Sequence, residues 1–124
     1  MIAVDTSSLV AYLSGAAGDD VEVVATALEH HQAILPPVVL TEILSDPKLS
    51  SQARLAFLDL PLLELTAGYW ERAGILRSGI LAKGRKARVA DALIAQSCLD
   101  ASIPLVTRDT DFRHFAQLAG LLLL

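Results

Sequence analysis

Short apolar runs alternate along the chain with longer segments in which apolar residues recur every three or four positions. The short runs are typical of buried strands, and the longer spacing is typical of amphipathic helices. The pattern predicts strands at 2–4, 33–35, 61–65 and 103–106, with a further apolar run at 121–124. It predicts helices at 8–13, 19–28, 36–45, 51–58, 68–83 and 88–100, with a helical turn at 110–116.

Local start and stop signals agree with these boundaries. Pro36 and Pro37 suit the first turn of a helix, since proline loses no hydrogen bond there, and Gly84 suits a helix end. Strands that alternate with helices predict parallel pairing, with helices on both faces of the sheet. The chain has 124 residues, 53% of them hydrophobic, enough for one core. We therefore predict a single α/β domain over residues 1–124, a three-layer α/β/α sandwich with a mostly parallel central sheet.

Four acidic residues lie where this architecture places functional groups. Asp5 follows the first predicted strand and Asp109 follows the fourth, so both carboxylates should emerge at the edge formed by the carboxyl ends of the strands. Glu42 and Asp91 lie among apolar residues of two predicted helices. Burying an ionised carboxylate is costly unless it is paired or bound to metal. If the four converge they predict a cation site, and an all-oxygen ligand set suits Mg²⁺ or Mn²⁺.

Each acid also has a purely structural interpretation, which would be preferred if that acid stood alone. Asp5 could cap the helix that follows it. Glu42 could belong to a narrow polar stripe facing solvent. Asp91 could complement a helix N-terminus or pair with the nearby Arg88, and Asp109 could begin a turn. Four such coincidences at strand ends and helix starts are less persuasive than each one separately.

Three blocks of sequence carry a family resemblance. They are "IAVDTSSLVAYL" at residues 2–13, "LPPVVLTEIL" at 35–44 and "RVADALIAQSCLDASIPLVTRDTDF" at 88–112. Their order and spacing resemble the PIN domain of VapC-type toxin ribonucleases over nearly the whole chain. The resemblance implies a parallel-sheet α/β/α fold and an acidic cluster that binds Mg²⁺ or Mn²⁺ and cleaves RNA.

The resemblance also implies roles for individual acids, as metal ligands and catalytic groups. Asp5, Glu42 and Asp91 match the family pattern. The fourth acid is either Asp109 or Asp111, and Asp109 ranks first because it lies closer to the strand end. Supporting hydroxyl groups that would orient the carboxylates are expected from nearby residues. These are Thr6, Ser7 and Thr107, and Asp111 is expected beside them.

The implied chemistry depends on charge. A phosphodiester attacked in line develops negative charge, which one or two divalent ions roughly 4 Å apart stabilise while lowering the pKa of a bound water. This chemistry requires no histidine as a general base. We therefore assign no catalytic role to His30, His31 or His114. Two divalent ions would also bring the formal net charge from −4 to 0, which eases approach of RNA. A basic segment could follow the phosphates or simply form a solvated connection. Its members are Lys83, Arg85, Lys86 and Arg88.

Other features bound the partners and the compartment. The predicted helix at 68–83 is apolar around much of its circumference, which with the resemblance predicts a homodimer. The resemblance also implies a small antitoxin partner. One cysteine, Cys98, excludes an internal disulfide, and no apolar stretch reaches the 18 or so residues of a membrane span. We therefore expect a cytoplasmic protein without a membrane segment.

Three alternative functions stay open. The chain could be a catalytically inactive PIN-like module that binds RNA or acts as a scaffold, although the presence of all four acids argues against it. A phosphatase of the haloacid-dehalogenase type would need Asp-x-Asp after the first strand, where Ser7 stands instead. A receiver domain would need paired acids after that strand and a lysine near the last one, which the sequence does not supply.

Overall fold

A small parallel sheet lies at the centre of the protein, which a computed structural model describes over all residues, 1–124. Its strands are β1 (Ile2–Val4), β2 (Ala33–Ile34) and β3 (Leu105–Val106), in the order β2-β1-β3. Both pairings are parallel, and Ala3 of β1 lies between Ile34 and Leu105 in register. The carboxyl ends of all three strands therefore meet at one edge.

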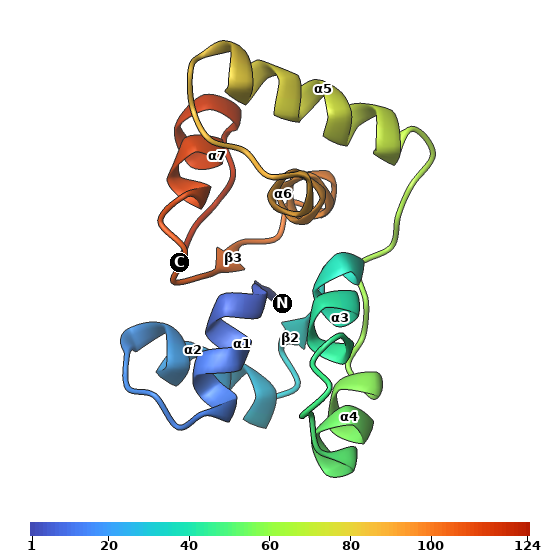
Figure 1. Cartoon of the computed structure of the whole chain (residues 1–124), viewed down its shortest axis with the longest axis vertical. Helices are drawn as coiled ribbons and strands as arrows, with labels where there is room; N and C mark the ends of the chain where they lie inside the picture. The colour runs from blue at the N-terminus through green and yellow to red at the C-terminus, as the bar shows by residue number, and fades with distance from the viewer.

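Seven helices cover this sheet. Figure 1 shows α5, α6 and α7 on one side of β3 and α1 and α2 on the other, which confirms the predicted three-layer α/β/α arrangement. Helix α2 contacts β2 and β3, while α6 contacts α3, α5 and α7. The bounds are α1 (Thr6–Leu13), α2 (Asp19–Glu29), α3 (Pro37–Leu44), α4 (Ser51–Leu58), α5 (Tyr69–Ala82), α6 (Val89–Ala101) and α7 (Phe112–Ala119).

Capping residues account for several of these boundaries. The Ser50 side chain accepts the backbone N–H of Ala53 at 3.1 Å and so caps the start of α4. Pro37 occupies the first turn of α3, as the sequence predicts. Gly120 ends α7 with a left-handed φ of 78°, a conformation that glycine adopts without steric cost.

The structure corrects the sequence prediction at both ends of the sheet. Residues 61–65 form no strand; Leu62 makes only a single parallel bridge to Leu35. Pro61 has no N–H to donate, so pairing does not extend there. Leu123 likewise makes one bridge to Leu105. Asp109 therefore follows the third strand rather than a fourth, and the helical turn expected at 110–116 is the complete helix α7.

One core joins the sheet to the helices on both of its sides. Phe112 and Phe115 of α7 are fully buried, and the centroids of their rings lie 5.9 Å apart. Cys98 of α6 is also buried, and desolvation raises the pKa of its thiol to about 12. No helix combines the length and the apolar composition that crossing a bilayer requires.

Removal of a core aromatic ring tests this assignment. Phe115→Ala should lower the free energy of unfolding by about 3–5 kcal/mol, because it removes buried apolar surface and leaves a cavity. Urea denaturation measures the change. Leu118→Ala in the same helix is the matched control, since Leu118 is 46% exposed and should cost far less. Equal destabilisation of the two variants would contradict the core described here.

Candidate functional site

Asp5 lies at the carboxyl end of β1 and is buried, with 4% of its surface exposed. Its Oδ2 atom accepts hydrogen bonds from the Ser7 hydroxyl at 2.6 Å and from the Thr107 hydroxyl at 2.7 Å. Although Asp5 occupies the N-cap position of α1, its side chain makes no capping bond. The carboxylate is therefore aimed at the end of β3 rather than used to start the helix.

The loop after β3 is organised around Thr107. Its hydroxyl donates to Asp5 and accepts the backbone N–H of Asp109 at 3.0 Å. Asp109 in turn accepts the backbone N–H of Asp111 on Oδ1 at 2.9 Å, so it also shapes a local turn. Asp109 thus begins a turn, as its purely structural interpretation predicted. The same turn also directs Asp109 and Asp111 toward Asp91 of α6.

Asp91 lies in the first turn of α6 and is 7% exposed. Its Oδ2 atom is buried and has no hydrogen-bond partner. The nearest cation is the Arg88 guanidinium, whose Nε lies 3.9 Å from that oxygen, beyond hydrogen-bond range. A buried carboxylate oxygen without a partner is costly, which points to a ligand that the protein itself does not provide.

Asp91, Asp109 and Asp111 form a group in which one oxygen of each residue lies within 4.8 Å of the others. Three carboxylates at this spacing, one carrying an unpartnered oxygen, fit a hard divalent ion such as Mg²⁺ or Mn²⁺. Burial is the largest cause that raises the pKa of Asp91 to about 6, and the negative charges of Asp109 and Asp5 add to it. Asp111 belongs to this group as fully as Asp109, so the structure does not favour one over the other.

Glu42 of α3 is placed differently from the other acids. It is exposed, which corrects the expectation that it lies embedded among apolar residues. Its Oε1 accepts the Thr6 hydroxyl at 2.8 Å, so it faces the start of α1, but it lies outside the group of three aspartates. Asp5 is also outside that group, although its charge raises the pKa of Asp91. Of the four predicted ligands, Asp91 and Asp109 thus lie in the group, while Asp5 lies near it and Glu42 lies outside it.

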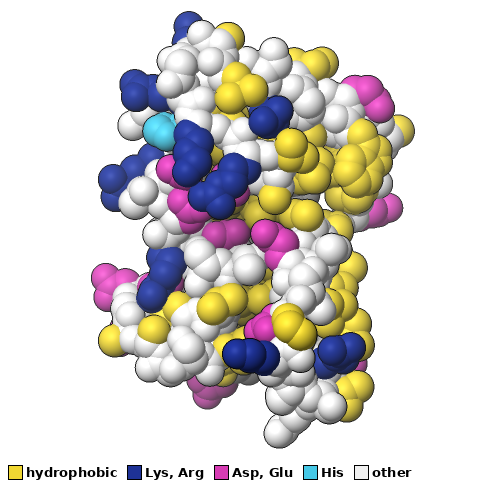
Figure 2. Space-filling view, in the orientation of Figure 1, with side chains coloured by type: hydrophobic (Ala, Val, Ile, Leu, Met, Phe, Trp, Pro, Cys, Tyr) yellow, Lys and Arg dark blue, Asp and Glu magenta, His cyan; other side chains and the backbone are white.

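Basic side chains from the segment before α6 stand over the aspartates. Lys86 Nζ lies 3.4 Å and Arg88 Nη2 lies 3.6 Å from Asp111 Oδ2. Figure 2 shows Lys and Arg side chains directly beside the acidic band that crosses the middle of this face. Lys83 and Arg85 make no ion pair with the protein. In the predicted basic segment, Lys86 and Arg88 therefore offset the charge of Asp111. Lys83 and Arg85 have no acidic partner in the protein.

One interaction at the site had no signal in the sequence. The Arg108 guanidinium donates two hydrogen bonds to Asp20, at 2.8 and 2.9 Å, and Asp20 also accepts the Ser8 hydroxyl at 2.9 Å. The bonds from Arg108 hold the pKa of Asp20 at about 2. Since Arg108 stands between Thr107 and Asp109, this pair anchors the loop to α2. The two residues are 88 positions apart, so no local pattern could join them.

The fold and this acidic edge place the chain among α/β/α proteins whose functional groups lie at the carboxyl ends of parallel strands. Residues 2–118 match the family described as PIN domain. The chain therefore belongs to the PIN domain family, as the resemblance implied. No curated protein matches the sequence.

Several solved structures share the fold at low sequence identity. VapBC2 from Rickettsia felis, bound to a DNA fragment from its promoter, has a TM-score of 0.74 and 22% identity, covering 100% of this chain and 98% of that one. DNA-bound VapBC from Salmonella typhimurium has a TM-score of 0.71 and 17% identity, and the match covers 100% of this chain and 98% of that one. VapBC-5 from Mycobacterium tuberculosis is a member of the VapBC family of toxin-antitoxin systems. It has a TM-score of 0.67 and 20% identity, and the match covers 99% of this chain and 96% of that one.

The raised pKa of Asp91 gives a pH-dependent stability that can be measured without metal. Between its ordinary value of 3.8 and about 6, the unfolded chain loses this proton while the folded chain keeps it. The free energy of unfolding should therefore fall as pH rises through this window, by roughly 2–3 kcal/mol, and change little above it on this account. Denaturation in EDTA at several pH values measures the slope.

Asp91→Asn should remove this contribution, because the amide does not titrate. Asp59→Asn is the control, since Asp59 is exposed at the end of α4. If wild type and Asp91→Asn lose stability equally across the window, Asp91 is not the group responsible.

Proposed function

We propose that this protein is a metal-dependent endoribonuclease and the toxin of a toxin–antitoxin pair. The observation that carries the proposal is the buried Asp91 oxygen without a partner, facing Asp109 and Asp111 at the carboxyl edge of the sheet. Membership of the PIN domain family and the likeness to VapBC structures support it. The metal is Mg²⁺ or Mn²⁺ because every ligand is a carboxylate oxygen.

In this proposal Asp91, Asp109 and Asp111 hold the ion, with Asp5 and Glu42 adding negative charge at the rim. When bound, such an ion supplies positive charge against a phosphodiester and makes water more acidic. Ser7 and Thr107 keep Asp5 fixed by bonding its Oδ2, which leaves Oδ1 for a further contact. Lys86 and Arg88 lie over the aspartates and would attract the phosphate backbone.

Two apolar surfaces suit the partners that we propose, a second copy of this chain and a small antitoxin. One groove runs between α5 and α6 and includes Trp70, Leu81 and Val89. Trp70 is 64% exposed, which is unusual for a large aromatic side chain without a partner. The other groove, between α1, α3 and α4, has Glu42 in its wall. We assign the first to the homodimer and the second to the antitoxin, and we place the protein in the cytoplasm.

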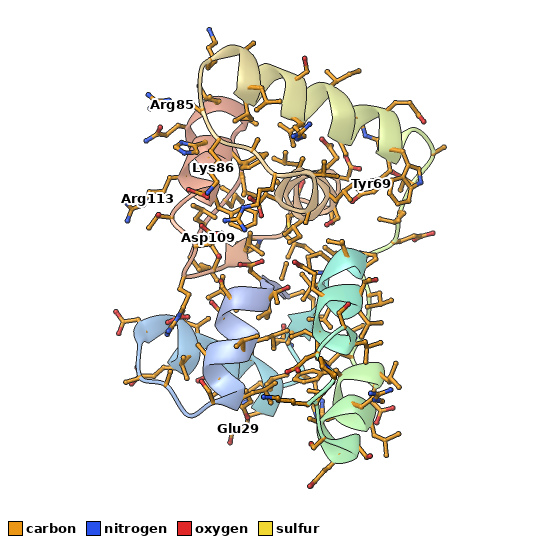
Figure 3. The ribbon with its side chains drawn as sticks, viewed as in Figure 1. Glu29, Tyr69, Arg85, Lys86, Asp109 and Arg113 are labelled. Atoms are coloured by element: carbon orange, nitrogen blue, oxygen red, sulfur yellow. The ribbon has the colours of Figure 1, made fainter.

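A nuclease assay tests the catalytic proposal. Wild type should cleave single-stranded RNA with Mg²⁺ or Mn²⁺ and not in EDTA. Thr107→Ala, which removes a hydroxyl that supports both Asp5 and the backbone of Asp109 but no proposed ligand, should lower activity by about 10–100-fold. Asp91→Asn and Asp109→Asn should lower it further, because they remove proposed ligands. Glu29→Gln is the control, since Figure 3 shows Glu29 in the lower part of the molecule, away from Asp109 near the middle.

Metal binding is checked independently by thermal unfolding. Mn²⁺ should raise the Tm of wild type, since an ion that binds only the folded state stabilises it by about 2.7 kcal/mol at 100 times its Kd. Asp5→Asn should reduce this rise and Asp91→Asn should abolish it. A Tm that does not respond to either metal would sink the metal-site proposal.

The homodimer is tested by sedimentation. Trp70→Glu should convert a dimer to the 13.2 kDa monomer, because it places a charge in the apolar α5–α6 groove. Leu55→Glu is the matched control, since Leu55 is 65% exposed on α4, away from this groove. A wild-type protein that sediments only as a monomer at micromolar concentration would remove the dimer and leave the catalytic proposal standing.

A further inference from the structure

A polar hollow of about 410 Å³ lies beside the acidic group, and no hydrophobic residue lines it. Arg85 contributes from the segment before α6, and Arg113, His114 and Gln117 contribute from α7. Figure 3 shows Arg85 and Arg113 on the same side of α7, above Asp109 in this view. Two segments distant in sequence thus present basic side chains to one space.

These two arginines differ from most others in the chain because no protein group binds them. Four of the seven arginines are held by protein partners, namely Arg72, Arg77, Arg88 and Arg108. Arg54, Arg85 and Arg113 make no side-chain hydrogen bond or ion pair. Two of the three arginines without a protein partner therefore line one hollow. An unpaired guanidinium forms its strongest hydrogen bonds with an oxyanion, so this hollow suits an anionic ligand.

The charge of the hollow is positive despite one acidic member. Asp111 also lines it, but its Oδ2 faces Lys86 and Arg88 at 3.4 and 3.6 Å, which offsets that negative charge. The Arg85 and Arg113 guanidinium groups remain, and the Gln117 amide adds a neutral hydrogen-bond donor. Asp111 is shared with the acidic group, so the hollow adjoins the proposed catalytic centre directly.

We propose that this hollow binds a backbone phosphate of single-stranded RNA, a neighbour of the phosphate that is cleaved, and so directs the strand from the aspartates toward α7. The inference rests on the proposed function, because it names how that same substrate is held. Arginine forks match phosphate oxygens, and His114 and Gln117 can add hydrogen bonds to phosphate or sugar. An acidic peptide fits less well, since no hydrophobic residue lines the hollow to receive its apolar side chains.

Fluorescence anisotropy with a labelled single-stranded oligouridylate, in EDTA so that no cleavage occurs, tests the proposal. The double variant Arg85→Gln/Arg113→Gln should bind several-fold more weakly than wild type. The slope of log affinity against log salt should decrease in magnitude by roughly 0.7, because the hollow no longer neutralises its one phosphate. Arg113→Lys should keep the wild-type slope because it keeps the charge.

Arg54→Gln is the matched control, since it removes an equally unpaired arginine from α4 and should leave both affinity and slope unchanged. The proposal is overturned if the double variant binds like wild type, if Arg54→Gln weakens binding as much, or if wild type binds no oligouridylate. It is also overturned if the double variant loses affinity for a poly-glutamate peptide but not for RNA.

A parallel cleavage assay with Mn²⁺ separates this proposal from the nuclease proposal. The double variant should show a higher KM with an unchanged kcat, because it binds RNA more weakly and keeps the aspartates. If wild type cleaves no RNA but the double variant still loses RNA affinity, the nuclease proposal fails and the phosphate site stands. If wild type cleaves RNA and the double variant has an unchanged KM, the phosphate site fails alone.

Discussion

The hydrogen bond from Thr107 to Asp5 joins the ends of two parallel strands, and the acidic edge is built around it. Parallel pairing of β1 with β3 brings the two residues together, and the backbone bond from Asp5 N–H to the Val106 carbonyl fixes their spacing. Thr107 then holds the N–H of Asp109 with the same hydroxyl. One side chain thus sets the positions of acids separated by about a hundred residues, against the repulsion between their charges.

Charge around this edge is arranged in two ways that serve different ends. Arg108 is held by two hydrogen bonds to Asp20 and anchors the loop, whereas Arg88 forms only a longer ion pair over Asp111. Arg85 and Arg113 make no ion pair and line the hollow that we propose for phosphate. Because a partnered guanidinium has little left to offer a ligand, its hydrogen bonds are a guide to whether an arginine supports the fold or awaits a substrate.

The sequence predicted the helices, the central strands and the edge on which the acids meet, because strong periodicity and strand-end positions are local signals. The exposure of Glu42 was missed because apolar neighbours in a helix do not show which face it occupies. The prediction of a strand at 61–65 was wrong, because Pro61 limits pairing to a single bridge. The position of Arg113 beside the same hollow as Arg85 could not be predicted while α7 was expected to be a single turn, and the Arg108–Asp20 pair depends on tertiary contact alone.

The order of these segments along the chain has a consequence for synthesis on the ribosome. The central strand β1 emerges first, but its neighbour β3 and the loop bearing Asp109 and Asp111 emerge only after more than a hundred residues. Every nascent chain shorter than this lacks two of the three grouped aspartates and one of the two hydroxyls that orient Asp5. Translation therefore assembles the acidic edge late, when nearly the whole chain has been made.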